Sequence, residues 1–234
     1  MNTRQRVVML TGAAGNLGRA VAQAFAAQGD ALVLVGHNRE SLVAAFGDEG
    51  PQRLFAPADL RRQDDVDRAV RSALERFGRI DVLCNLAGTF RMGEAVHETS
   101  DATWDLLLDL NARSLLRTAH AVTPVMLKQG GGKIINVGSY AAQKGAAQTG
   151  AYIASKAVVA RLTETMAAEL REHGINVNAV LPTLIDTPEN RAAMPGADPQ
   201  RWVAPQDLAN VIVFLASDAA RAVHGATLPV TGLS

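Results

Sequence analysis

The stretch that decides the fold is Val7-Val8-Met9-Leu10-Thr11-Gly12-Ala13-Ala14-Gly15-Asn16-Leu17-Gly18. It begins with a short apolar run, which is typical of a buried parallel strand. Three spaced glycines follow, and an alanine-rich helix is predicted over 19–28. Glycines let the backbone approach a pyrophosphate closely, and a helix N-terminus offers it free N–H groups. The alternative is a tight turn that binds nothing, but the flanking strand and helix favour a dinucleotide site.

The rest of the chain alternates strand-like runs with helical patterns. We predict six further strands, over Ala31–Val35, Arg53–Pro57, Ile80–Cys84, Lys133–Val137, Ile175–Leu181 and Ala226–Val230. Helices are predicted over 64–77, 102–129, 152–173 and 205–216, and the segment 182–199, which has four prolines, is expected to be irregular. This order predicts a single α/β domain over 1–234, a Rossmann-type doubly wound parallel sheet of about seven strands with helices on both faces.

Composition excludes several classes of partner. The 234 residues include 23 basic and 23 acidic side chains, so the formal net charge is zero and neither nucleic acid nor an anionic membrane is an expected partner. The lone Cys84 excludes an intramolecular disulfide and a multi-cysteine metal cage, and no metal site is predicted. No apolar run is long enough to span a membrane, and the polar Met1–Arg6 predicts no signal peptide, so a cytoplasmic location is expected.

The end of the second predicted strand bears on the choice of cofactor. NAD-binding folds usually carry an acid there, which accepts a hydrogen bond from the ribose. This chain has Gly36-His37-Asn38-Arg39 instead. Arg39 and His37 could face a 2′-phosphate, so NADP(H) is favoured and NAD(H) remains possible. The alternative is that Arg39 is only the exposed first turn of the next helix. Asp59 could reach the adenine or cap the helix that begins near Gln63.

Candidate catalytic residues lie in the second half of the chain. Tyr152 and Lys156 are four residues apart and therefore share a helix face, where the cation would lower the phenol pKa. Such a pair is also common on protein surfaces. Ser139 follows the fifth predicted strand, and ligands of parallel sheets bind beyond the carboxyl ends of strands. Asn111, by pattern alone, is a satisfied core amide.

Taken together, these residues resemble the classical-type short-chain dehydrogenase/reductase family over essentially the whole chain. The cofactor turn of that family resembles Thr11 to Gly18, and its Asn-x-Ala-Gly element matches Asn85, Ala87 and Gly88. Its active-site tetrad is similar to Asn111, Ser139, Tyr152 and Lys156. The resemblance implies that the cofactor is also contacted by Gly12, Gly15, Asn16, Leu17, Gly18, His37, Asn38, Asp59, Leu60, Pro182 and Thr187.

The resemblance implies hydride transfer between a nicotinamide and a small carbonyl or alcohol substrate. Tyr152 would protonate the developing alkoxide, and Ser139 would hydrogen-bond the same oxygen. Lys156 would lower the Tyr152 pKa and bind the nicotinamide ribose, while Asn111 would hold a water that links Lys156 to solvent. The family also implies a homo-oligomer, either a tetramer or a dimer.

We expect the substrate to lie beneath a loop or lid over 183–204. Met194 and Trp202 would provide apolar cover, and Arg191 could meet an anionic group. The alternative is that Trp202 only packs the lid onto the body and that Arg191 is solvated.

Two departures from the family pattern keep other functions open. The GxxGxxG spacing places Asn16 where classical members have glycine, and Thr183 replaces another usual glycine. The segment 184–202 has a local resemblance to dihydropteridine reductases, so a pteridine reductase is the alternative enzyme. A non-catalytic NAD(P)-binding sensor or scaffold is the alternative from another class.

Overall fold

The computed structural model describes residues 5–234. Residues 1–4 belong to the segment Met1–Arg6, for which the sequence predicts no signal peptide, and they lie outside the described residues. Seven parallel strands form one sheet in the order β3-β2-β1-β4-β5-β6-β7. The strands are β1 (Val7–Thr11), β2 (Ala31–Gly36), β3 (Arg53–Pro57), β4 (Val82–Asn85), β5 (Gly132–Val137), β6 (Ile175–Pro182) and β7 (Thr227–Val230). The predicted fold class is confirmed.

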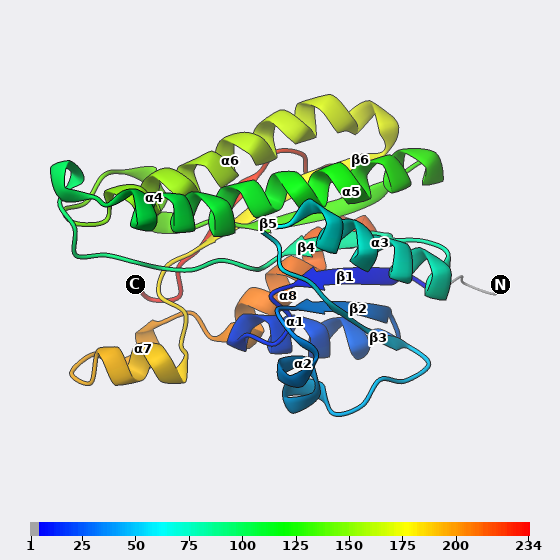
Figure 1. Cartoon of the computed structure of the whole chain (residues 1–234), viewed down its shortest axis with the longest axis horizontal. Helices are drawn as coiled ribbons and strands as arrows, with labels where there is room; N and C mark the ends of the chain where they lie inside the picture. The colour runs from blue at the N-terminus through cyan, green and yellow to red at the C-terminus, as the bar shows by residue number, and fades with distance from the viewer. Residues whose placement is uncertain (1–4) are drawn as a thin grey trace.

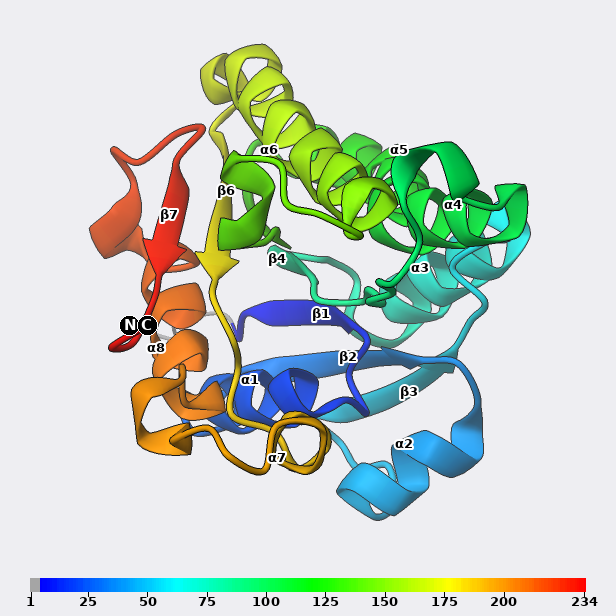
Figure 2. The same cartoon turned by 90° about the vertical axis from the view of Figure 1, so that its left-hand side faces the viewer.

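Helices cover both faces of the sheet (Figures 1 and 2). One face carries α3 (Gln63–Phe77), α5 (Ser114–Gln129) and α6 (Gly150–Leu170), and their buried residues share an apolar core with the sheet. The other face carries α1 (Asn16–Ala26), α2 (Arg39–Phe46) and α8 (Pro205–Leu215), which share a second core. Both faces of β1, β2, β4 and β6 are buried in this way, which explains why their sequences are mostly apolar runs and do not alternate.

The sheet reverses its direction of winding at β1. This strand pairs with β2 on one side and with β4 on the other, so the connections leave it in opposite directions. The loops at the carboxyl end of β1 therefore diverge and leave a crevice between them. Ligands bind in this crevice in open α/β sheets.

Two predicted segments differ from the structure. The helix expected over 102–129 is α4 (Asp101–Leu108), then a π-helical turn over Asp109–Arg113, then α5. A π-turn fits one extra residue into a helix, and here it contains Asn111, whose exposed fraction is 3%. One extra residue changes the apolar periodicity of 102–129 very little, so the sequence pattern predicts one continuous helix.

The second difference is α7 (Pro188–Ala193), which lies inside the segment expected to be irregular. Pro188 occupies the first turn, where its missing N–H costs nothing, and the Thr187 hydroxyl accepts a 3.2 Å bond from Asn190 N–H. A proline inside the segment expected to be irregular therefore begins this helix. The α1 helix also starts at Asn16, three residues earlier than predicted.

Within residues 5–234 no helix combines the length and the apolar character that crossing a membrane requires.

Candidate functional site

A cavity of about 660 Å³ opens at the carboxyl ends of β1, β2 and β4. It brings together three stretches that sequence reasoning had assigned to a cofactor: the glycine turn, the end of β2 and the segment after β4. Its lining consists of Gly12, Ala14, Gly15, Asn16, Leu17, Gly18, Val35, Gly36, His37, Ser41, Ala58, Asp59, Leu60, Arg61, Leu86, Ala87, Gly88, Leu110 and Thr187.

The glycine turn has no room for a side chain at Gly12 or at Gly18. Gly12 has a φ of +64°, and a Cβ there would lie 2.9 Å from the Ala87 backbone. A Cβ on Gly18 would lie 2.3 Å from the Gly12 carbonyl oxygen. The α1 helix that follows has no side-chain cap and no acid in its first turn, so its first N–H groups remain free for a ligand. A backbone cradle with a helix N-terminus fits a pyrophosphate.

Asn16 and Thr187 connect this turn to the loop above it. The Asn16 side chain donates to Glu189 Oε2 at 2.7 Å and accepts from Arg19 Nη2 at 2.7 Å. Glu189 belongs to α7, and Thr187, which caps α7, lines the cavity. One wall of the cavity is therefore joined to the start of α1.

At the β2 end, the structure separates the three residues proposed for a 2′-phosphate. His37 lines the cavity, but Asn38 and Arg39 do not. Asn38 caps α2 by accepting from Ser41 N–H at 2.8 Å, and Arg39 pairs with Glu49 at 2.6 Å. Arg39 does stand in the first turn of a helix, as the alternative held, and its charge is engaged by a carboxylate.

Asp59 and Leu60 line the same end of the cavity. Asp59 does not cap α3, because the N-cap position is Arg62 and that position has no side-chain cap. Its carboxylate binds Arg61 instead, with Nη2 2.8 Å from Oδ2. The capping alternative for Asp59 is therefore wrong.

Gly88 connects the cavity to the predicted catalytic residues. A Cβ on Gly88 would lie 2.9 Å from Asn111 Oδ1 and 3.1 Å from Lys156 Nζ. A larger residue at this position would displace one of these two side chains. Lys156 is 6% exposed and donates from Nζ to the Val137 carbonyl at 2.9 Å. Burial lowers the Lys156 pKa to about 8, because the ammonium loses its hydration.

Tyr152 lies one helical turn before Lys156 on α6. Burial raises the pKa of its phenol, and a polar interaction with Ser139 opposes that rise. The expected lowering of this pKa by Lys156 is wrong for this structure, since burial determines the direction. The Phe90 ring packs edge-on against the Tyr152 ring, with centroids 4.8 Å apart, and contributes to this burial. A phenol with a raised pKa keeps its proton at neutral pH.

The Asn111 amide is satisfied within the protein. Its Oδ1 accepts from Thr89 N–H at 2.7 Å, and its Nδ2 donates to the Thr89 carbonyl at 3.0 Å. The second Nδ2 hydrogen goes to Ser155 Oγ, 2.9 Å away. Asn111 thus joins the segment after β4 to the helix that carries Tyr152 and Lys156.

The predicted substrate residues stand apart from the cavity. Trp202 is 9% exposed and packs into the body, while Met194 is 36% exposed. Arg191 is neither free nor simply solvated, because Asp186 binds it through two 2.6 Å contacts. The base of the 183–204 loop is closed by the Val203 N–H, which donates to the Leu184 carbonyl at 2.9 Å.

Other expected residues are also placed away from the cavity. Asn85 belongs to a buried chain of side chains, accepting from Thr118 at 2.8 Å and donating to Asn136 at 2.9 Å. Pro182 is buried at the end of β6. Thr183, the second departure from the family pattern, donates to the Thr231 carbonyl at 2.9 Å and so fastens the end of β6 to the C-terminal segment.

Sequence reasoning missed Arg61, Ser41, Phe90 and Ser155. Arg61 could have been found, because it stands two residues beyond Asp59 at a strand end where ligands bind. Ser155 lies between Tyr152 and Lys156 in the sequence, but its role depends on a partner 44 residues away. Across residues 5–234 no cluster of three or more His, Cys, Asp or Glu side chains could hold a metal ion.

Known proteins resemble this chain along its full length. A family model described as enoyl-(acyl carrier protein) reductase matches residues 12–232. The D-threitol dehydrogenase of Mycolicibacterium smegmatis is 36% identical, over 97% of this chain and 92% of that protein. The short-chain reductase protein NovJ of Streptomyces niveus is 35% identical, over 98% and 94%. A solved structure titled NAD+-bound xylitol dehydrogenase has a TM-score of 0.89 and 28% identity, and the match covers 99% of this chain and all of that one.

Proposed function

The chain belongs to the short-chain dehydrogenase/reductase family of oxidoreductases, and from this premise we propose that it transfers a hydride between NADP(H) and a small carbonyl or alcohol substrate. One observation carries the proposal. The segment after β4 lines the cofactor-sized cavity with Gly88, and the same glycine is packed against Lys156 and Asn111. The cavity and two of the proposed catalytic side chains, Lys156 and Asn111, therefore meet at this glycine.

The chain's own residues would act as follows in carbonyl reduction. Tyr152, which keeps its proton at neutral pH, donates it to the substrate oxygen, and the Ser139 hydroxyl binds the same oxygen. Lys156, one helical turn further along α6, carries a positive charge that burial makes costly. Donors fixed in advance around a developing oxyanion lower the barrier because they need no reorganisation. The nicotinamide, when bound, supplies or accepts the hydride.

The preference for NADP(H) is supported by the end of β2. Gly36, His37 and Ser41 line the cavity there, and no carboxylate of β2 stands where NAD-binding folds place one. A related protein was solved with NAD+, so likeness to relatives does not decide between the two cofactors.

The first test is a titration of the purified protein with NADPH and with NADH, following the fluorescence of the bound reduced nicotinamide. We expect tighter NADPH binding, followed by oxidation of NADPH with a member of a panel of small carbonyls. The panel includes the ketoses that correspond to threitol and xylitol, and a quinonoid dihydropteridine. Tighter NADH binding would overturn the cofactor proposal. Binding without turnover on the panel would favour a non-catalytic sensor.

We also propose a homo-oligomer, a dimer or a tetramer, in the cytoplasm. The support is the family resemblance and apolar side chains exposed on α5 and α6, including Leu116, Leu127 and Val158. Sedimentation equilibrium measures the mass directly, and a monomer at micromolar concentration would contradict the oligomer.

A further inference from the structure

We propose, on the basis of the proposed NADP(H) function, that the Asp59–Arg61 ion pair is the element that selects the phosphorylated cofactor. Arg61 neutralises the carboxylate of Asp59 and presents its remaining N–H donors to the 2′-phosphate. The pair thus replaces the cation that sequence reasoning had sought in Arg39.

The register of the sheet places this pair at the adenosine end of the cavity. Gly36 at the end of β2 pairs with Pro57 at the end of β3, and Ala58 N–H donates to the Gly36 carbonyl at 2.8 Å. The residues that follow, His37 and Asp59, therefore emerge at the same edge. Both line the cavity, together with Arg61. In dinucleotide folds the end of β2 is where the adenosine ribose is recognised.

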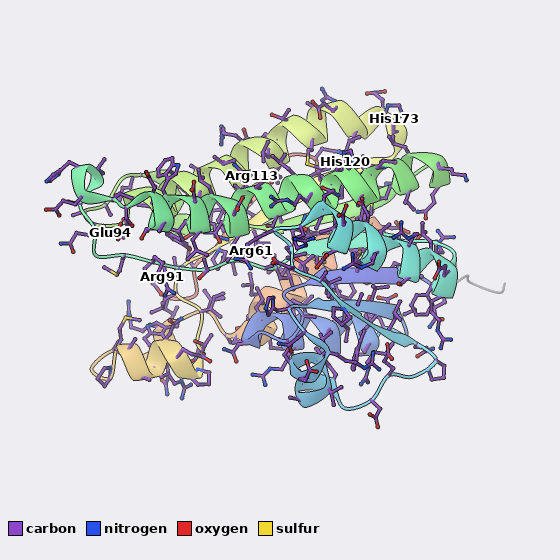
Figure 3. The ribbon with its side chains drawn as sticks, viewed as in Figure 1. Arg61, Arg91, Glu94, Arg113, His120 and His173 are labelled. Atoms are coloured by element: carbon purple, nitrogen blue, oxygen red, sulfur yellow. The ribbon has the colours of Figure 1, made fainter. Side chains whose placement is uncertain are left out.

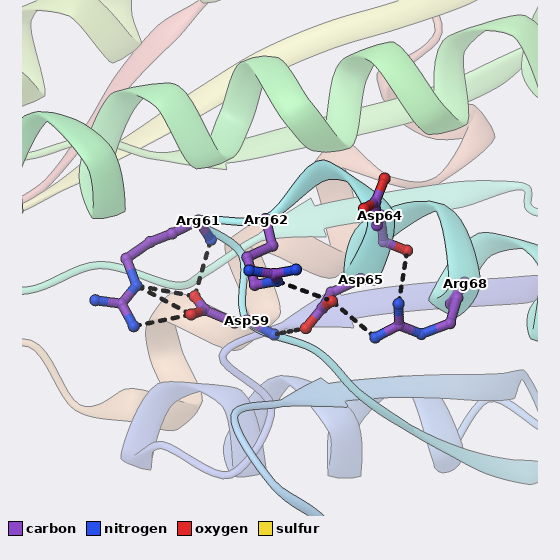
Figure 4. Close-up of polar contacts among 6 residues, drawn as sticks. All are labelled: Asp59, Arg61, Arg62, Asp64, Asp65 and Arg68. Atoms are coloured by element: carbon purple, nitrogen blue, oxygen red, sulfur yellow. Dashed lines mark hydrogen bonds and ion pairs between the residues drawn. The ribbon is translucent and has the colours of Figure 1, made fainter.

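Arg61 is bound to Asp59, but this contact does not occupy all of its N–H donors. Nε lies 2.9 Å from Oδ1, and Nη2 lies 2.8 Å from Oδ2. An arginine has five N–H donors, and these contacts leave Nη1 and one Nη2 hydrogen for another acceptor. Figure 4 shows the guanidinium beside the Asp59 carboxylate, with Nη1 turned away from it. In the view of Figure 3, Arg61 lies near the centre of the outline, whereas Glu94 and His173 lie toward its edges.

The pair is held in place by its own loop. The Arg61 backbone N–H donates to Asp59 Oδ1 at 3.0 Å, and the Asp59 backbone N–H donates to Asp65 Oδ2 at 3.1 Å. Asp65 in turn accepts from Arg68 at 2.7 Å, as Figure 4 shows. A cation whose position is fixed before binding loses less freedom when an anion arrives.

The negative charge of the Asp59 carboxylate makes neutralisation by Arg61 necessary. Hydrogen bonds from Arg61, with a smaller contribution from the nearby His37, lower the Asp59 pKa to about 2, so this carboxylate is ionised at neutral pH. Without Arg61, a full negative charge would face the 2′-phosphate. A carboxylate at this end is tolerated by NADH, whose ribose hydroxyl can donate to it.

Arg39 provides the matched comparison. It pairs with Glu49 at 2.6 Å, its guanidinium carbon lies 5.7 Å from the centre of the Phe55 ring, and it does not line the cavity. Its positive charge is therefore paired outside the cavity, although it stands only three residues after Gly36.

The test measures the Kd of NADPH and of NADH by nicotinamide fluorescence for the wild type, Arg61→Gln, Arg39→Gln and Asp59→Asn/Arg61→Gln. Hydrogen bonds to charged groups indicate that Arg61→Gln weakens NADPH binding by roughly ten- to a hundredfold. NADH binding should change by less than about threefold, and Arg39→Gln should leave both constants unchanged. The double variant should regain at least about threefold of the lost NADPH affinity, because the repelling charge is gone.

The outcomes separate this inference from the proposed function. The wild-type ratio of the two Kd values tests the preference for NADPH, and the variants test which residue produces it. If NADPH is preferred and Arg61→Gln leaves the ratio unchanged, or if Arg39→Gln shifts it equally, the Asp59–Arg61 assignment is overturned while the function stands. A double variant no better than Arg61→Gln would overturn the neutralising role. Urea denaturation of each variant verifies folding, since Asp59 and Arg61 lie in the β3–α3 loop and Arg39 lies on the surface of α2.

Discussion

Asn111 and Ser155 are joined by a 2.9 Å hydrogen bond that connects the π-turn between α4 and α5 to α6. Ser155 extends this connection to the backbone of Tyr152, because its own hydroxyl donates to the Tyr152 carbonyl at 2.7 Å. Both side chains are almost completely buried. The position of the proposed acid is therefore fixed by two helices together.

Ser155→Ala should lower both stability and turnover. It leaves an Asn111 N–H buried without its partner, which costs about 1–3 kcal/mol in the free energy of unfolding. The NADPH Kd should stay the same, because Ser155 does not line the cavity. Urea denaturation and kcat measure the two effects. Ser114→Ala is the control: it removes a buried hydroxyl that bonds only within its helix, to the Leu110 carbonyl at 2.8 Å. Equal kcat in the two variants would rule out a positioning role for Ser155.

Tyr152→Phe should fold and bind NADPH normally but lose turnover by on the order of 10²–10³-fold, since it removes one fixed donor to the substrate oxygen. The chain has two tyrosines, so Tyr140→Phe is a matched control. Tyr140 is 42% exposed, and its variant should retain activity. Near-normal turnover of Tyr152→Phe would remove this residue from the acid role.

Burial of Lys156 should make stability depend on pH in a predictable direction. Its pKa is about 8 in the folded protein and near 10.5 when unfolded, so between these values the unfolded chain binds more protons. Stability therefore rises with pH across this window. Lys156→Met lacks the group, so its stability advantage over the wild type should shrink between about pH 8 and pH 10. Urea denaturation of both proteins at each pH measures the difference. A constant difference would mean that the Lys156 pKa is unshifted.

Gly18→Ala should damage the phosphate cradle. The added Cβ would lie 2.3 Å from the Gly12 carbonyl oxygen and 2.4 Å from that of Ala13, and neither backbone group can yield easily. We expect a loss of stability of about 1–3 kcal/mol and at least a tenfold weaker NADPH affinity. Gly50→Ala, where a Cβ meets nothing within 4 Å, is the control. The titration described above and thermal unfolding report the two effects, and equal affinities in the two variants would contradict the cradle.

The sequence predicted those features that depend on short-range pattern. The strand, glycine turn and helix at the N-terminus, and the alternation of strands and helices, follow from local apolar runs and identify the sheet. The positions of Tyr152 and Lys156 follow from helical spacing.

Features that depend on partners far along the chain could not be predicted in the same way. The charge of Arg39 is taken by Glu49, ten residues later, and the raised pKa of Tyr152 reflects burial by tertiary packing that includes Phe90. The loop pair Asp59–Arg61 has no periodicity that would indicate it. The π-turn at Asn111 leaves the apolar pattern almost unchanged, because one extra residue shifts it by less than a third of a turn.

The extra residue in the π-turn limits which deletions the protein can tolerate. Deleting one residue between 109 and 113 would convert the π-turn to ordinary α-helix, because the turn holds one residue more than the helix on either side needs. The core residues Leu115, Thr118 and Val122 would stay on the buried face, but Asn111 would lose its aim at Thr89 and Ser155. A deletion here would thus spare the core and disturb the active centre. Related sequences that keep the chemistry should therefore keep this extra residue.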